Sequence, residues 1–318
     1  MPSGEMPSPL MFTPLLQERV WGGRELADVF GKALPPAKAI GESWELVDRP
    51  EAQSVVANGP LKGRTLHELW TQHRQEIFGG PPKTAREPRA LPKFPLLIKL
   101  LDAKEKLSLQ VHPPERVAAK LGGEPKTEFW YVAHADPGAE VFVGFCHRIT
   151  REDLAAAIKT DRVVDLVHRV PVKSGDAMFL PAGRFHGIGG GCVLVEIQQN
   201  SDTTYRVFDW ERKDRQLHLE EALQCIDFED IAPSLVTPQG ESLIRNNLFE
   251  IEKWTLTQQR EAAPPGQFAI ICCLSGALRC ADVDLRPGDF VLIPASLQDR
   301  QLHPRAGDTS LLRVTIPT

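Results

Sequence analysis

Short strand-like segments recur along the chain, and they constrain its fold more than any other feature. Each is only a few residues long, rich in β-branched and aromatic side chains, and bounded by Gly, Pro, Asp or Asn. The chain has 27 prolines and 24 glycines among 318 residues, so proline exceeds the usual level of about 5%. This pattern argues against a helical bundle and favours a sandwich or jelly roll. The predicted strands are 96–101, 106–111, 128–133, 177–180, 192–199, 205–210, 268–273 and 290–294.

Helices are few, and three are marked by their start signals. Thr65 and Glu68 have the spacing of a capping box, which predicts a helix from residue 66 towards Phe78. Thr150 and Asp153 mark a second helix, with an apolar face that extends to residue 166. A third helix is expected near residues 219–225. The fold class is therefore mainly β, with a few helices inserted mostly in the N-terminal part.

Two segments resemble each other and predict two related β units. Residues 175–186 and 288–299 both begin with Gly-Asp, continue with an apolar strand, and reach Pro-Ala at the same offset. The twelfth position is His186 in the first copy and Asp299 in the second. Residues 230–242 are a plausible linker between the units. We therefore predict a metal-binding domain over residues 1–230 and a metal-free β domain over residues 231–318.

The overall charge and the lack of recognised targeting signals indicate which partners and which cell compartment to expect. The net charge is −5 and the sequence pI is near 6.0, so nucleic acid is not an expected partner. No signal peptide is recognised at the start, and the apolar run 94–101 is too short to cross a bilayer. None of the six cysteines forms a CxxC pair, so all are expected to be reduced. We expect a cytoplasmic protein that is a monomer or a small homo-oligomer.

Polar side chains with metal-binding chemistry lie on two of the predicted strands. Alternation places Ser108, Gln110 and His112 on one strand face, with apolar residues on the other. Lys126 and Glu128 share a face at the start of an aromatic strand. Each segment by itself also fits a surface strand whose polar face meets water, so neither segment alone establishes a site.

His186 ends a more specific pattern. Gly175, Pro181, Gly183 and His186 match the second sequence motif of the cupin superfamily, in which the histidine binds a metal. With Gln110, His112 and Glu128, it supplies an amide, two imidazoles and a carboxylate, a set suited to Zn²⁺ or another divalent first-row metal. Glu115 is a rival carboxylate, but it follows two prolines and fits the exposed first turn of a helix better.

Longer motifs resemble those of the class I (type I) phosphomannose isomerases of the short bacterial kind. The resemblance covers most of residues 15–220 and is loose over the last hundred residues. The longest match, Glu196–Trp210, is nearly diagnostic. The other matching motifs are Val20–Gly23, Ile40–Glu45, Phe94–Lys99, Leu107–Pro113 and Lys126–Tyr131.

The resemblance implies a fold and a set of site residues. It implies two cupin-type jelly-roll units, of which the first carries one zinc ion and the second none. The implied zinc ligands are Gln110, His112, Glu128 and His186. The family's active-site arginine falls on Arg206, and Lys126 and Asp202 occupy positions of pocket or proton-transfer groups. Lys99 and Ser108 match positions near the sugar phosphate.

The implied reaction is the interconversion of mannose 6-phosphate and fructose 6-phosphate through a cis-enediol. It needs a base that moves a proton between C2 and C1 and a charge that stabilises the substrate oxygens. Lys126, Asp202 and Glu128 remain alternatives for the base, and Arg206 would stabilise the charge. Two other functions stay open: a metal-dependent cupin oxygenase and a non-catalytic sugar-phosphate-binding cupin.

Overall fold

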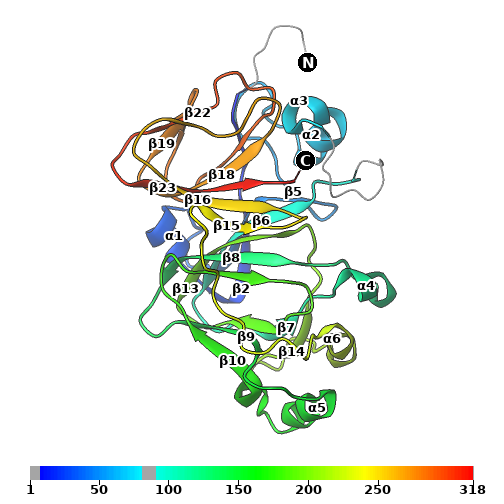
Figure 1. Ribbon diagram of the computed structural model, residues 1–318. Helices are drawn as coiled ribbons and strands as arrows, with labels where there is room; N and C mark the ends of the chain where they lie inside the picture. The colour runs from blue at the N-terminus through cyan, green and yellow to red at the C-terminus, as the bar shows by residue number, and fades with distance from the viewer. Residues whose placement is uncertain (1–7, 81–90, 318) are drawn as a thin grey trace.

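The computed structural model describes residues 8–80 and 91–317, and the protein is mainly β, as predicted (Figure 1). Its larger sheets form two groups that follow one another along the chain. One group makes the lower part of the molecule in Figure 1, and the other makes the upper part. We call them the N-terminal unit and the C-terminal unit.

The N-terminal unit packs a six-stranded sheet against a five-stranded one. The spatial order of the larger sheet is β11 (Ala177–Leu180), β8 (Glu128–Ala135), β13 (Cys192–Gln199), β6 (Leu96–Ala103), β3 (Ile40–Leu46) and β2 (Leu15–Gly23). The order of the smaller sheet is β10 (Val167–Pro171), β9 (Glu140–Phe145), β12 (His186–Ile188), β7 (Leu109–Val111) and β14 (Tyr205–Phe208). Apolar side chains from both sheets meet between them, among them Trp130, Leu194, Val143 and Ile188.

The C-terminal unit also pairs two antiparallel sheets. The first runs β1 (Leu10–Met11), β21 (Phe290–Ile293), β18 (Ala269–Ser275), β23 (Thr309–Thr315), β16 (Glu250–Leu256) and β15 (Ser242–Arg245). The second runs β17 (Arg260–Glu261), β22 (Gln301–Pro304), β19 (Leu278–Cys280) and β20 (Val283–Leu285). Apolar side chains such as Trp254, Ile271 and Leu311 fill the space between these sheets. A small hairpin, β4 (Asp48–Arg49) with β5 (Ala52–Gln53), lies outside both units' sheets.

All helices of the described residues lie before residue 226, which confirms their predicted place. They are α1 (Glu25–Phe30), α2 (Leu66–Gln72), α3 (Arg74–Phe78), α4 (Glu115–Ala118), α5 (Arg151–Lys159) and α6 (Leu219–Cys225). The predicted capping box is present at Thr65, and the second predicted helix also begins with one, at Thr150. The first predicted helix breaks at His73, and the second ends at Lys159, followed by a 3₁₀ turn over 163–166. No described helix has the length and apolar character that crossing a bilayer requires.

The two similar sequence segments form the same local structure. Gly175 and Gly288 both have positive φ, 95° and 83°, which glycine adopts without strain. The aspartate that follows each glycine closes the same turn: Asp176 accepts a hydrogen bond from Lys173 N, and Asp289 accepts one from Arg286 N. Each turn then leads into a strand, β11 or β21. The two segments therefore repeat each other in structure as well as in sequence.

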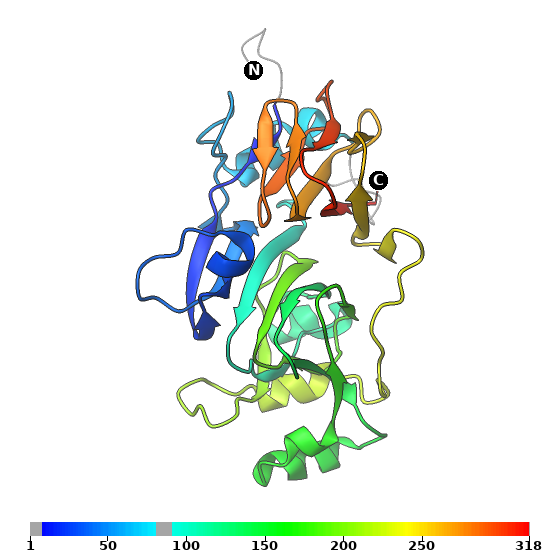
Figure 2. The same ribbon diagram turned by 90° about the vertical axis from the view of Figure 1, so that its left-hand side faces the viewer.

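The N-terminal and C-terminal units share hydrogen bonds and one apolar core. Strand β1 belongs to the C-terminal sheet through its pairing with β21, although it begins the described chain. Helix α3 contacts the same unit, because Ala295 N donates to Ile77 O, and Phe78 packs edge-on against Phe268. In Figure 2 a long connection after α6 returns the chain to the upper unit. The domain division at residue 230 stays a prediction.

A buried carboxylate of β6, which contacts the start of α1, predicts that the stability of the protein depends on pH. Asp102 is 1% exposed, and its Oδ2 accepts a hydrogen bond from Glu25 N at 2.7 Å. Burial raises its pKa to about 6 from 3.8. The folded state therefore binds more protons than the unfolded state between these values, and the unfolding free energy falls as pH rises through them.

We expect Asp102→Asn to remove this fall of the unfolding free energy with rising pH. From pH 4 to pH 7 the stability of the variant should rise relative to wild type by on the order of 3 kcal/mol, since each pKa unit is worth about 1.4 kcal/mol. Urea unfolding at both pH values measures the difference, and Asp28→Asn on the exposed side of α1 is the control. A stability difference that does not change with pH contradicts the prediction.

Candidate metal centre and active site

The candidate site lies between the two sheets of the N-terminal unit. In the smaller sheet, β7 is flanked by β12 and β14, and their register places Gln110 opposite both His186 and Arg206. In the larger sheet, β8 begins at Glu128. Strands from distant parts of the chain thus bring the predicted ligands to one place.

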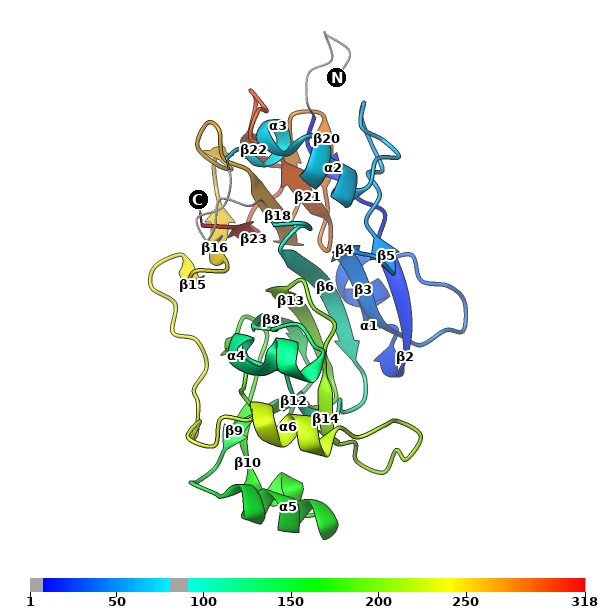
Figure 3. The ribbon, with the colours of Figure 1, turned by 90° about the vertical axis from the view of Figure 1, so that its right-hand side faces the viewer.

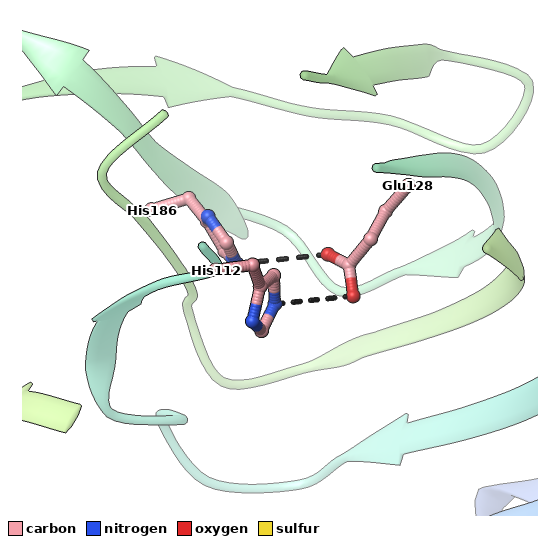
Figure 4. Close-up of side chains that lie close together, drawn as sticks. All are labelled: His112, Glu128 and His186. Carbon is pink, nitrogen blue, oxygen red and sulfur yellow. Dashed lines mark ion pairs between the residues drawn. The ribbon is translucent and has the colours of Figure 1, made fainter. Parts of the chain in front are cut away.

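Three of the predicted ligands form a tight, buried cluster (Figure 4). Each of His112, Glu128 and His186 is 1% exposed, and their potential ligand atoms lie within 4.8 Å of one another. Glu128 Oε1 is 3.2 Å from His112 Nε2, and Glu128 Oε2 is 3.6 Å from His186 Nε2. The Gln110 amide nitrogen lies 3.5 Å from His186 Nε2, so the fourth predicted ligand borders the same space.

The cluster fits a divalent metal. The Nδ1 atoms of His112 and His186 lie 2.8 Å and 2.9 Å from the carbonyl oxygens of Thr203 and Arg184, so each Nε2 faces the centre of the cluster. His112, His186 and Lys126 surround the carboxylate of Glu128 as ion-pair partners, yet within the described chain His112 Nε2 and both Glu128 oxygens make no well-aligned hydrogen bond. Buried polar atoms without such a bond are rare in proteins unless a ligand satisfies them.

The electrostatics also suit a cation-binding site. Burial and the neighbouring His112 lower the pKa of His186 to about 3, so its imidazole is neutral. Burial together with the charge of Lys126 lowers the pKa of His112 as well. Burial opposes ionisation of Glu128, but Lys126 and His112 outweigh it and hold the pKa of Glu128 well below its usual range. Neutral imidazoles and an ionised carboxylate are the forms that ligate zinc.

A chain of hydrogen bonds connects the cluster to Arg206. Ser108 Oγ donates to Gln110 Oε1 at 3.1 Å and accepts from Arg206 Nε at 3.2 Å. Arg206 Nη1 also donates to the carbonyl of Gln216. The Arg206 side chain is therefore held by Ser108, which contacts the predicted ligand Gln110, and by the loop that follows β14.

A cavity of about 290 Å³ adjoins the cluster. It is lined by all five predicted catalytic and substrate-binding residues, which are Lys99, Ser108, Lys126, Asp202 and Arg206. Lys126 Nζ forms an ion pair with Glu128 Oε1 at 2.7 Å. The structure thus brings the predicted catalytic and substrate-binding residues to one cavity, which Gln110 also lines, and Lys126 connects this cavity to the buried cluster.

The cavity also contains charged residues to which sequence reasoning gave no role. Glu42 and Glu196 are almost fully buried and lie on either side of Lys99. Glu196 Oε2 is 3.4 Å from Lys99 Nζ. Burial opposes the charge of Lys99, but the two carboxylates outweigh it and raise its pKa. For Glu196 the sequence signal was a carboxylate inside an apolar run, residues 192–197, where a lone charge is costly.

Residues that the sequence analysis set aside lie outside the cluster. Glu115 is exposed at the start of α4, as expected for a first-turn acidic residue. All six cysteines are free, and only Cys146 is exposed.

Comparisons with known proteins agree with this geometry. Residues 10–124 match the family model of the type I phosphomannose isomerase catalytic domain. The mannose-6-phosphate isomerase ManA of Bacillus subtilis is 36% identical over 313 residues, which cover 93% of this chain and 96% of that protein. These values are high enough to establish common ancestry over nearly the whole chain.

Solved structures show the same fold. The crystal structure of the mannose 6-phosphate isomerase from Bacillus subtilis has a TM-score of 0.84 and 33% identity, with 98% of this chain and 100% of that one covered. A mannose 6-phosphate isomerase bound with zinc and yttrium has a TM-score of 0.76 at 18% identity, again over 98% and 100% of the two chains. The arrangement of two β units is thus common to all three.

Proposed function

This chain belongs to the type I phosphomannose isomerase family and is therefore an isomerase, and we propose that it uses one zinc ion to interconvert mannose 6-phosphate and fructose 6-phosphate. The observation that carries the proposal is the buried cluster of His112, Glu128 and His186 beside a charged cavity. We further propose that the enzyme acts in the cytoplasm.

His112, Glu128, His186 and Gln110 would hold the metal. A bound zinc ion supplies Lewis acidity towards the carbonyl and hydroxyl oxygens of a substrate. The carbonyl oxygens of Thr203 and Arg184 keep the two imidazoles oriented for this task. Gln110 as a fourth ligand leaves fewer open positions than an oxygenase with two histidines and one carboxylate would have, which favours the isomerase.

Lys126 and Asp202 are the proposed proton-transfer residues. An aldose becomes a ketose when a proton leaves C2 and another is added at C1, and one group on one face of the substrate can do both. Lys126 lies against Glu128 and lines the cavity, and Asp202 lines it from the segment before β14. Both therefore reach the space next to the metal ligands.

Arg206 is proposed to stabilise the negative charge that develops on the substrate oxygens. An arginine stays cationic at any physiological pH, so it can offset this charge throughout the reaction. Ser108 and the carbonyl of Gln216 hold the guanidinium before substrate arrives. Such preorganisation is effective because no rearrangement is needed in the transition state.

Isomer exchange followed by NMR tests the proposal. We expect added mannose 6-phosphate to convert to fructose 6-phosphate, conversion to fall at least about a hundredfold after treatment with a chelator, and zinc to restore it. Oxygen consumption without isomerisation would instead indicate an oxygenase. Binding without exchange would indicate a non-catalytic module.

A further inference from the structure

The loop between β14 and α6 carries a group of charges that the proposed mechanism does not use (Figure 3). Its members are Asp209, Arg212 and Arg215. Asp209 is 3% exposed, although a carboxylate in a surface loop normally faces water. Its burial indicates that the loop is built around it.

Asp209 holds two guanidinium groups at once. Its oxygens accept hydrogen bonds from Arg215 Nε at 2.7 Å and Arg215 Nη2 at 2.6 Å. They also accept from Arg212 Nε at 3.1 Å and Nη2 at 2.7 Å. The two arginines then point to different places: Arg215 lines the active-site cavity, whereas Arg212 lines a separate groove on the outside.

Arg206 and Arg215 give one end of the cavity an excess of positive charge. The other cavity cations each have a carboxylate within 4 Å: Arg19 with Glu42, Lys99 with Glu196, and Lys126 with Glu128. Among the described residues, Arg206 has no such partner, and Arg215 shares Asp209 with Arg212. The exposed Glu105 lies 3.8 Å from Arg212, on the outer side.

The charges at this end of the cavity act on one another. Burial and the nearby charge of Arg215 lower the pKa of Arg206. Both guanidinium groups also keep a nitrogen free: in the described chain no hydrogen bond is found for Arg215 Nη1 or Arg206 Nη2. An anion bound at Arg215 would relieve this repulsion and take up the free donor of Arg215, while the free donor of Arg206 stays available for the reacting substrate oxygens.

Arg215 lies beyond Arg206 on the path of contacts that leads from the metal ligands, and its side-chain hydrogen bonds go only to Asp209. From His186 the contacts run to Gln110, then to Ser108, then to Arg206, and Arg215 follows on the next loop. In a hexose 6-phosphate, the reacting C1 and C2 and the phosphate are likewise at opposite ends of the carbon chain. Lys99 is less suited to a dianion, because two carboxylates already surround it.

We propose that Arg215 binds the phosphate group of the substrate and that Asp209 positions the guanidinium of Arg215. This inference rests on the proposed function, since it assigns the phosphate end of the same site. Arginine suits the task, because its planar fork can give one edge to Asp209 and the other to a phosphate oxygen.

Kinetics of Arg215→Met test the inference. We expect the KM for mannose 6-phosphate to rise about ten- to hundredfold, the range for a lost hydrogen bond to a charged group, with kcat little changed. The Kd of inorganic phosphate, measured by calorimetry on the zinc-loaded enzyme, should rise by a similar factor. Arg212→Met is the matched control, because it loses an equal charge and the same Asp209 contact but lines the outer groove.

Two further variants separate positioning from folding. Asp209→Asn should raise KM without a matching fall in kcat, and its effect should largely disappear in the Arg215→Met background, because both act through one contact. Arg215→Lys should recover part of the affinity. A KM and a phosphate Kd like those of wild type in Arg215→Met overturn the inference. A wild-type enzyme that binds phosphate through Arg215 but makes no fructose 6-phosphate overturns the proposed function instead.

Discussion

Replacing His186 with alanine is expected to abolish metal binding and isomerase activity together. The side chain is buried, and its Nε2 faces Glu128 and Gln110. Without it, the remaining donors do not complete a four-ligand site. We expect kcat/KM to fall roughly 10³-fold or more, since a catalytic metal supplies several kcal/mol of transition-state stabilisation. His112→Ala should have the same effect.

Metal content and thermal unfolding check this result independently of activity. A metal that binds only the folded state stabilises it, so a chelator should lower the Tm of wild type but leave that of His186→Ala unchanged. His134→Ala is the control, because His134 is a half-exposed histidine on β8, the strand that begins with Glu128. A His186→Ala protein that retains zinc and turnover would show that the ligand set is wrong.

The local signals of the sequence predicted elements well where one short segment determines the structure. Thr65 and Thr150 begin helices because each satisfies its own cap. Two of the predicted strands are shorter than expected by two or three residues. The strand predicted over 205–210 ends at Phe208, because Trp210 takes a left-handed conformation with φ of 55°. The strand predicted from residue 106 begins at Leu109.

The metal ligands were recognisable because they lie in motifs and alternate along strands. The contacts between the charged residues around these ligands were not recognisable from the sequence. Lys99 and Glu196 meet because β6 and β13 pair in a register that places them opposite each other. Asp209 and Arg215 meet because a loop folds back on itself. Register and loop closure depend on the whole sheet, so no local pattern in the sequence predicts these contacts.

Removing the Arg206 side chain is expected to reduce turnover while the metal stays bound. Arg206 is not itself among the proposed ligands, and it reaches them only through Ser108 and Gln110. Loss of a single preorganised donor to a developing negative charge costs about 10²–10³-fold in kcat. We therefore expect Arg206→Ala to lose kcat in this range and to contain as much zinc as wild type.

Two variants make this result specific. Arg206→Lys keeps the positive charge but not the fork that donates to Ser108 and Gln216, so its kcat should lie between those of wild type and Arg206→Ala. Arg162→Ala removes an exposed arginine far from the cavity and should leave kcat unchanged. If Arg206→Ala turns over at the wild-type rate, the role in charge stabilisation is wrong. If it loses its zinc, Arg206 acts by holding Ser108 and Gln110 in place for the metal.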